Sequence, residues 1–387
     1  MIRTILAACA TLAIVTSAHA EDRPLKIGWI TSFTGPGAAA GAITDAAIAA
    51  FQKKYGDSVA GRKVQIIRRD TTGPAPDVAK RLAQELIVGE KVDFIAGMDY
   101  TANTMAIAPL STSAKVPLLI VNSATSGILA KHPYLTRFGF TTTSVAKEVA
   151  AYAAKNGMKN VYTFTHEFEP GLDAEAMFIR EFKAAGGAIA GSVRAPMKTT
   201  DFSPYIQRIK DAKPDAVFVF MAAGEKPSIF LRQFKEAGAD QSIKIIGTGD
   251  IVDEPNLPAA GDAALGIVTA FHYAPTHDSA LNKEFAAAFA AIAPGKSLNF
   301  VAAATYDTIH AIYDVVEKQK GDINPDKTME LMKQLRFESP RGPIEIDPAT
   351  RDIVQTIYFR KTEKVDGKLV NVEFASVPNV KDPGSAR

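Results

Sequence analysis

Short apolar runs alternate with amphipathic stretches along the chain from Leu25 to Ala270. One run, Ala216–Phe220, is apolar at every position. The stretches between the runs repeat their apolar residues every three or four positions, which is the spacing of the buried stripe of a helix. Strands that alternate with helices indicate right-handed βαβ units and parallel sheets, and a wholly apolar strand fits a sheet that helices cover on both faces.

The alternation predicts strands and helices at defined places. We expect strands at 25–30, 64–69, 94–96, 118–121, 161–164, 188–194, 216–220, 244–247 and 265–270. We expect helices at 45–55, 75–88, 101–114, 145–156, 174–185, 202–210 and 226–237. The rhythm restarts after Thr141, so the chain is expected to form two α/β lobes in series.

The pattern changes after Ala270. Three helices are expected in near succession, followed by a turn-rich segment and three late strands. The helices fall at 282–291, 301–317 and 326–335, the turn at 339–343, and the strands at 344–346, 356–359 and 370–374. These elements form no complete α/β unit, which is explained if the chain crosses back to complete both lobes. The tail from Asp382 is polar, and we expect it to be loose.

The composition is that of an ordinary globular protein. Of 387 residues, 47% are hydrophobic and 22% are charged, which is typical of a chain that buries a sizeable core. The formal net charge is +2, and no stripe of basic residues interleaved with aromatic ones occurs, so nucleic acid is not an expected partner.

The first twenty residues predict export. Arg3 precedes an apolar region at 5–15, and the small residues Ala18 and Ala20 flank His19 just before the predicted cut after Ala20. The apolar region is shorter than the roughly 20 residues of a membrane span. Cys9 stands in a box that resembles a lipoprotein cleavage site, but few apolar residues precede it, so a lipid anchor is the less favoured alternative. A cut after Ala20 removes the only cysteine, and with it disulfides and thiol chemistry.

Motifs of catalysis and of cofactor binding do not occur. The sequence has no HExxH, no GxSxG and no GxGxxG after a strand, and its six histidines are scattered. Gly295-Lys296-Ser297 imitates the end of a P-loop, but the first glycine of that motif is replaced by Ala290 and no strand precedes it. We expect a surface turn there, and neither enzymatic activity nor a cofactor nor a metal.

Short motifs follow one another in order over residues 24–376. They are KIGWI at 26–30, TGPG at 34–37, DTT at 70–72, ELI at 85–87, VDFIAG at 92–97, NSATS at 122–126, GTGD at 247–250 and ATYD at 304–307. In this order and spacing they resemble the leucine/isoleucine/valine-binding family, the periplasmic binding proteins of ABC transporters. The resemblance implies the type I periplasmic binding fold: α/β, with two doubly wound parallel-sheet lobes joined by three hinge crossings and ligand in the cleft.

The resemblance also implies where the chain divides. The signal peptide is 1–20, the N-terminal lobe 24–141 plus 273–343, and the C-terminal lobe 142–272 plus 344–380. The crossings are expected near Phe140–Thr142, Phe271–Tyr273 and Gly342–Ile346. Ligand at the carboxyl ends of the parallel strands would favour the closed arrangement of the lobes.

The start of the helix at 101–114 is the expected carboxylate site. Free N–H groups and the positive end of the helix dipole favour an anion there. The resemblance places a ligand carboxylate on Thr101, with Ala124 and Thr125 in the loop that completes the site. Thr101 could equally be a plain helix N-cap. Tyr100 walls the cleft or packs in the core, whereas Asp99 would repel an anion and is expected to cap the helix or face solvent.

The position that holds a ligand ammonium in amino-acid binders of the family falls near Gly249, with Asp250 next to it. Gly249 offers no acid, and Ala40 stands where branched-chain binders carry an aromatic wall, which leaves room for a larger solute. The loop Glu167–Asp173 resembles that of members which take aromatic acids, although Asp173 could instead cap the next helix. Further candidate binding residues are Phe33, Phe168, Met221, His272 and Phe300, each of which could also be core or hinge.

These observations predict a periplasmic solute-binding protein of an ABC importer. It is expected to be a monomer that captures a small carboxylate, an aromatic acid being the class the pocket suits, and delivers it to a membrane permease and ATPase. The alternatives are a branched-chain or other amino-acid binder of the same family and the ligand-sensing module of a receptor. An enzyme on the same scaffold stays open, because fold does not fix function.

Overall fold

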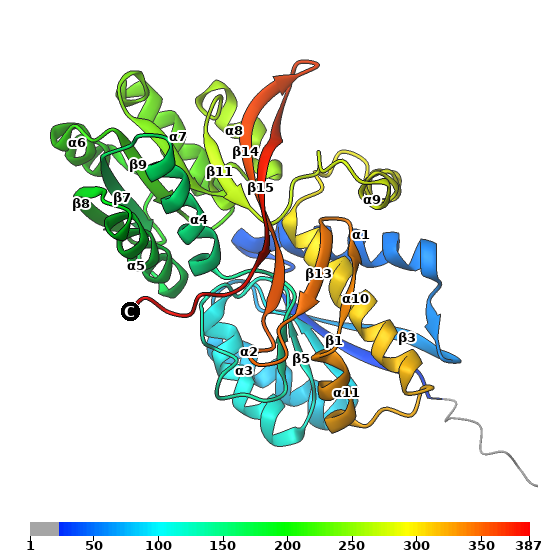
Figure 1. Cartoon of the computed structure of the whole chain (residues 1–387). Coiled ribbons are helices and arrows are strands. Elements are labelled where there is room, and N and C mark those ends of the chain that lie inside the picture. The colour runs from blue at the N-terminus through cyan, green and yellow to red at the C-terminus, as the bar shows by residue number, and fades with distance from the viewer. Residues whose placement is uncertain (1–22) are drawn as a thin grey trace, which may run out of the picture.

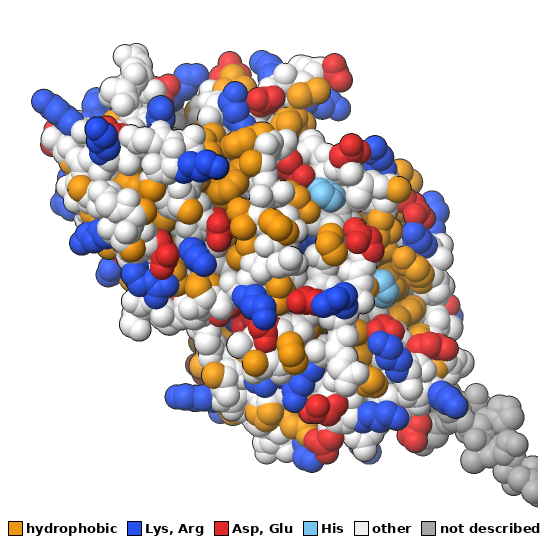
Figure 2. Space-filling model, in the orientation of Figure 1, with side chains coloured by type: hydrophobic (Ala, Val, Ile, Leu, Met, Phe, Trp, Pro, Cys, Tyr) orange, Lys and Arg blue, Asp and Glu red, His pale blue; other side chains and the backbone are white. Residues whose placement is uncertain are grey.

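A computed structural model describes residues 23–387 (Figure 1). The predicted signal peptide at 1–20 and the alternative lipid site at Cys9 lie outside these residues. Two α/β lobes lie side by side, one formed mainly by the first part of the chain and the other by the middle part, and the last two long strands run between them. Basic and acidic side chains are intermixed over the face drawn in Figure 2, in keeping with the small net charge.

The first lobe is built on a six-stranded sheet in the order β2-β3-β1-β4-β5-β6. Its strands are β1 (Leu25–Thr31), β2 (Ser58–Val59), β3 (Arg62–Asp70), β4 (Phe94–Gly97), β5 (Leu118–Ile120) and β6 (Leu135–Arg137). All pairings are parallel except that of β2 with β3. Its helices are α1 (Ala38–Tyr55), α2 (Pro76–Gln84), α3 (Thr101–Ala114), α10 (Phe300–Lys318) and α11 (Pro325–Met332).

Both faces of this sheet are covered. Trp29 of β1 packs in one apolar cluster with residues of α1 and α10, and its neighbour Ile30 packs in another with residues of α2 and α3. Adjacent residues of a strand point to opposite faces, so an apolar strand here needs helices on both sides.

The second sheet has the order β12-β13-β14-β11-β10-β9-β7-β8, with β15 paired to β14. Strands β7 to β11 belong to the second lobe, whereas β12 and β13 lie beside α10 of the first lobe (Figure 1). The strands are β7 (Asn160–His166), β8 (Ala188–Ala195), β9 (Ala216–Phe220), β10 (Lys244–Thr248), β11 (Val268–Phe271), β12 (Arg336–Ser339), β13 (Gly342–Ile346), β14 (Ile353–Val365) and β15 (Lys368–Val380). The helices are α4 (Thr142–Lys155), α5 (Glu169–Ala184), α6 (Ser203–Ala212), α7 (Glu225–Glu236) and α8 (Leu257–Ala260), with α9 (Ala280–Ile292) on the return to the first lobe.

The α/β fold with two sheets confirms the predicted class, with one difference. Strands β7 to β11 are parallel, whereas β12 to β15 pair antiparallel, so the sheets are mixed and mostly parallel. The wholly apolar run Ala216–Phe220 is strand β9, buried throughout. Phe218 stacks on Phe178 of α5, with ring centroids 4.2 Å apart.

Three segments connect the lobes. The chain passes from β6 into α4 and from β11 toward α9, and β14 is the third link. Strand β14 pairs with β13 at Ile353 and with β11 at Tyr358. The predicted lobe boundaries stay predictions, but the pairing places the third link within β14, beyond the expected Gly342–Ile346.

The late strands are longer than expected. β14 and β15 form a hairpin over 353–380, where only 356–359 and 370–374 were predicted. The predicted segment 356–359 lies in the buried part of β14, whereas 370–374 lies in the half-exposed part of β15 near the turn. Charged and polar residues around both segments interrupt the apolar runs, so the rest of the hairpin was not predicted. The predicted helix at 326–335 ends at Met332, because Arg336–Ser339 pairs with β13 instead.

The polar tail after β15 is not loose as expected. Its Asp382 carboxylate accepts hydrogen bonds from Ser126 Oγ at 2.5 Å, from Thr141 Oγ1 at 3.1 Å and from Thr143 Oγ1 at 2.7 Å. These hydroxyls come from the loop after β5 and from the start of α4. The tail therefore attaches to the first link between the lobes, and a polar composition did not reveal this because its partner is far away in the sequence.

Candidate ligand-binding site

A cavity of about 120 Å³ is lined by residues of both sheets' connecting loops. An engineered apolar cavity of about 150 Å³ holds benzene, so this space has the scale of one aromatic ring. It lies at the carboxyl ends of β4, β5, β9 and β10, where α/β sheets bind ligands. Predicted site residues on its wall are Ala40, Tyr100, Thr101, Ala124, Phe168, Asp250 and Phe300.

One wall is the N-terminus of α3. Its N-cap residue Tyr100 is extended, and no side chain caps the helix. Thr101 is the first helical residue, so it is not the N-cap, and its Oγ1 lies 3.0 Å from Thr125 Oγ1. The first N–H groups of α3 therefore have no side-chain acceptor, and the positive end of the helix faces the cavity. This end suits an anion.

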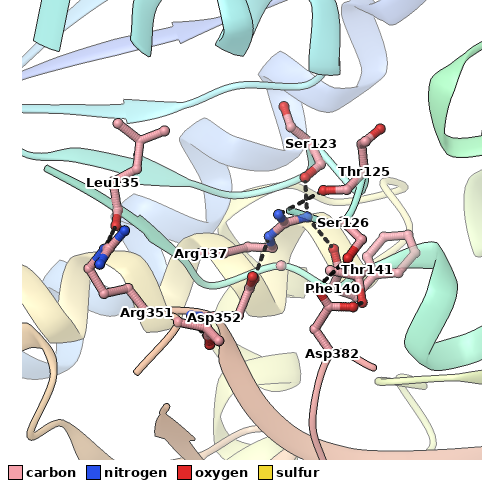
Figure 3. Close-up of polar contacts among 12 residues, drawn as sticks. Ser123, Thr125, Ser126, Leu135, Arg137, Phe140, Thr141, Arg351, Asp352 and Asp382 are labelled. Carbon is pink, nitrogen blue, oxygen red and sulfur yellow. Dashed lines mark hydrogen bonds and ion pairs between the residues drawn. The ribbon is translucent and has the colours of Figure 1, made fainter. Parts of the chain in front are cut away.

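Arg137 orients the loop beside this helix (Figure 3). The guanidinium of this buried residue donates from Nη1 to the Ser123 carbonyl at 2.7 Å and from Nη2 to the Thr125 carbonyl at 2.8 Å. In a trans peptide the N–H points opposite to the preceding C=O. The Ala124 N–H consequently points away from Arg137, and Ala124 lines the cavity.

Asp99 also lines this wall, contrary to the expectation that it caps a helix or faces solvent. Its Oδ2 accepts hydrogen bonds from the backbone N–H of Ser32, at 2.9 Å, and from the Ser32 hydroxyl. Burial raises the pKa of Asp99 above its ordinary value. Asp99 is therefore an acid of the cavity wall that is held by Ser32 rather than exposed to solvent.

The opposite wall carries two acids from the turns that follow β10. Asp250 is buried, its Oδ2 has no hydrogen-bond partner among the described residues, and burial raises its pKa to about 7. Asp253 accepts from Asn299 Nδ2 at 3.1 Å on each oxygen, and burial with the nearby charge of Glu254 raises its pKa well above the ordinary value. Asn299 is also the N-cap of α10, so it connects the two lobes across the cavity.

Gly249 cannot carry the acid that amino-acid binders place nearby. A Cβ there would lie 2.3 Å from Arg360 Nη2 and 2.3 Å from the Phe271 ring. Arg360 is buried and donates to the carbonyls of Tyr273, at 2.6 Å, and Gly249, at 3.3 Å. The Arg360 and Phe271 side chains therefore occupy the space that a side chain at position 249 would need. Asp250 is the acid of this turn that lines the cavity.

Aromatic side chains form the remaining walls. Phe140 and Phe300 meet edge to face with centroids 6.0 Å apart, and Phe168 stacks on Phe220 at 5.8 Å. All four line the cavity. Apolar walls with a few placed polar groups are typical of small-molecule sites.

The other predicted residues lie off the cavity wall, each for a visible reason. His272 is fully buried and stacks on Phe140 at 4.8 Å, and burial lowers its pKa well below the ordinary value. Met221 is in the core of the second lobe. Asp173 accepts from the Ser126 N–H at 3.2 Å and from Arg387 Nε at 2.8 Å. Phe33, Thr125 and Gly249 likewise lie outside the lining.

Several lining residues escaped sequence analysis. Most of them lie in loops or at strand ends, where no hydrophobic periodicity marks a residue. They come together only in the folded protein. The lining residues not predicted are Gly37, Ala39, Ile43, Asp99, Asn122, Phe140, Pro170, Phe220, Ala222, Ala223, Gly224, Asp253, Pro255, Asn256, Asn299 and Val301.

Two features are absent from residues 23–387, the part of the chain that the structure describes. In this part of the chain no helix combines the length and the apolar character of a membrane span. The same residues contain no group of three or more His, Cys, Asp or Glu arranged to hold a metal ion.

Comparison with known proteins decides the family. The model of a family described as periplasmic binding protein matches residues 24–368. The chain belongs to that family. This binding protein is 38% identical to Leu/Ile/Val-binding protein homolog 6 of Brucella abortus over 98% of each chain. The resemblance drawn from the motifs is thereby confirmed, and the chain is a solute-binding protein of the ABC-transporter type rather than an enzyme.

Solved structures of similar proteins include two with bound aromatic acids. The solute-binding protein of an ABC transporter from Rhodopseudomonas palustris BisB5, in complex with 3,4-dihydroxybenzoic acid, is 48% identical, with a TM-score of 0.90 over 94% of this chain and 99% of that one. A second R. palustris solute-binding protein, in complex with 4-hydroxybenzoate, is 40% identical, with a TM-score of 0.90 and the same coverage. These similarities confirm the type I fold.

Proposed function

We propose that this binding protein captures a small aromatic carboxylate between its lobes in the periplasm and delivers it to an ABC permease. The observation that carries the proposal is that the lining of one cavity combines the uncapped N-terminus of α3 with four phenylalanines. The helix terminus and the Ala124 N–H suit the carboxylate. Phe140, Phe168, Phe220 and Phe300 suit the ring.

The size of the cavity and the relatives support the same class. A space of about 120 Å³ fits one ring better than an extended solute. Two relatives that are 48% and 40% identical were solved with hydroxylated benzoic acids. In this proposal the protein is exported by its signal peptide, acts as a monomer and closes around the ligand by hinge motion.

An amino-acid ligand is the second candidate, because Asp250 is an unpartnered buried acid that could hold an ammonium. The filled space at Gly249 disfavours it, since no acid can stand where amino-acid binders of the family carry theirs.

A thermal-shift screen separates the two candidates. The chain without residues 1–20 is unfolded and refolded to remove any bound solute, then heated with benzoate, hydroxybenzoates, phenylpropanoid acids, leucine or valine. A ligand that binds only the folded state raises the Tm by mass action. We expect the aromatic acids to raise the Tm and the amino acids to leave it unchanged. A rise with leucine and none with any aromatic acid would overturn the proposal.

A further inference from the structure

We propose that Asp250 accepts a hydrogen bond from a ring hydroxyl of the ligand, so that the cavity selects hydroxylated aromatic carboxylates over benzoate. The inference rests on the proposed function and adds the residue and the chemical group that set its specificity.

The first step is the unpartnered oxygen of Asp250. The side chain is buried and lines the cavity, and neither oxygen of its carboxylate has a hydrogen-bond partner among residues 23–387. Oδ2 is enclosed in the wall, so a ligand in the cavity would reach the carboxylate at Oδ1. An acceptor that is buried without a partner costs free energy. A donor on the ligand would remove that cost, whereas a bare ring edge would make it permanent.

The second step is that the nearest cation does not satisfy Asp250. The Arg360 guanidinium donates to the Gly249 and Tyr273 carbonyls and, at 3.4 Å, to Glu254 Oε1. Its charge still acts on Asp250 through space. The Asp250 carboxylate therefore lies in the wall near a cation but accepts no hydrogen bond from it.

The third step is the position of Asp250 relative to the start of α3, where the ligand carboxylate is proposed to bind. Asp250 belongs to the second lobe, and Thr101 and Ala124 belong to the first. A ligand whose carboxylate lies on α3 therefore directs the far edge of its ring toward the wall with Asp250. A hydroxyl on that edge is a neutral donor that an aromatic-walled cavity can enclose.

The neighbouring acid extends the argument to adjacent hydroxyls. Asp253 is buried, lines the same wall and accepts from one donor group, the Asn299 amide. A carboxylate has about four lone-pair sites, so Asp253 keeps acceptor capacity. Two acceptors side by side suit a ring with two adjacent hydroxyls, as in 3,4-dihydroxybenzoate.

Titration calorimetry on the refolded protein tests the inference with benzoate, 4-hydroxybenzoate and 4-methoxybenzoate. The methoxy compound keeps the oxygen but has no proton to donate. We expect 4-hydroxybenzoate to bind about 100-fold more tightly than either of the others, because a site built for a hydroxyl rejects an analogue that lacks it. Equal affinities, within about threefold, would overturn the inference while leaving the proposed function intact.

Asp250→Asn assigns the effect to the residue. Asparagine keeps the shape but replaces one acceptor oxygen with a donor, so the preference for 4-hydroxybenzoate over benzoate should fall below about tenfold. Asp240→Asn, an exposed acid on the same lobe, is the matched control and should retain the full preference. An unchanged preference in Asp250→Asn would contradict the assignment.

If that variant fails to fold, the three-ligand comparison on the unmodified protein still decides. Binding of leucine alone would refute both proposals.

Discussion

Arg137 Nε lies 2.6 Å from Asp352 Oδ1, and both side chains are buried. Through this ion pair the start of β14 is joined to the guanidinium that holds the Ser123 and Thr125 carbonyls (Figure 3). The loop at the carboxylate site and one of the three links between the lobes therefore share a side chain. A change at Arg137 should act on both stability and binding.

We expect Arg137→Met to lower the free energy of unfolding by about 3–5 kcal/mol, because Asp352 is left as a buried, unpaired acid. Urea unfolding measures the loss. Arg336→Ala is the control: this arginine is 78% exposed, and its loss should cost at most about 1 kcal/mol. The double variant Arg137→Met with Asp352→Asn should recover part of the stability. A single variant as stable as the control would contradict the role of the pair.

Thr101→Val should weaken the binding of an aromatic carboxylate about tenfold, the value of one hydrogen bond of roughly 1.4 kcal/mol. Valine keeps the shape of threonine and removes only the hydroxyl that lies against Thr125. Calorimetry gives the Kd. Ser113→Ala, on the exposed side of the same helix, is the control and should bind like the unmodified protein. An unchanged Kd in Thr101→Val would show that the hydroxyl does not bind the carboxylate, which would leave the backbone N–H groups as its donors at this helix start.

The elements that the sequence predicts well are those whose signal is local. Ala216–Phe220 is apolar at every position and is a central strand. Thr101–Ala114 was predicted with both ends correct. The hairpin at 353–380 was predicted only at 356–359 and 370–374, because charged and polar residues interrupt its apolar runs and its pairing is set by the turn and the fold.

Asp250 should make stability depend on pH. Its pKa is raised from 3.8 to about 7 in the folded chain, so the folded state binds more protons than the unfolded state between these values. The contribution of Asp250 to the free energy of unfolding should then fall as the pH rises from about 4 to about 7 and stay constant above that.

The test is the difference in unfolding free energy between the unmodified protein and Asp250→Asn, measured at several pH values. The difference cancels the contributions of groups that do not interact with Asp250. Asp253 contributes to the difference, because the charge of Asp250 raises its pKa. The difference should decline toward pH 7 and then level off. A difference that does not change with pH would show that Asp250 titrates normally.

Asp382 should contribute to the joining of the lobes. Asp382→Ala removes the acceptor of the Ser126, Thr141 and Thr143 hydroxyls and should cost about 2 kcal/mol of unfolding free energy, as expected for hydrogen bonds to a charged group at a partly exposed site. Lys381→Ala changes the neighbouring exposed residue and should cost less than about 1 kcal/mol. Equal stability of the two variants in urea would show that the tail is not held by Asp382.

The site shows the limits of sequence reasoning more clearly than the fold does. Thr101 and Ala124 were predicted on the cavity because a helix start and its partner loop carry a motif. Asp253 and Asn299 were not, since they come from separate turns and meet only when the lobes are assembled. His272 looked available for a ligand, but its strand ends inside an aromatic cluster.

The central claim is that an aromatic carboxylate lies between the α3 terminus and Asp250. A crystal structure of the protein grown with 4-hydroxybenzoate measures this directly. We predict the carboxylate within hydrogen-bond distance of the Thr101 and Ala124 N–H groups, the ring between Phe140, Phe168, Phe220 and Phe300, and the hydroxyl on the Asp250 carboxylate. A ligand bound outside this cavity, or one with its carboxylate turned toward Asp250, would contradict the account.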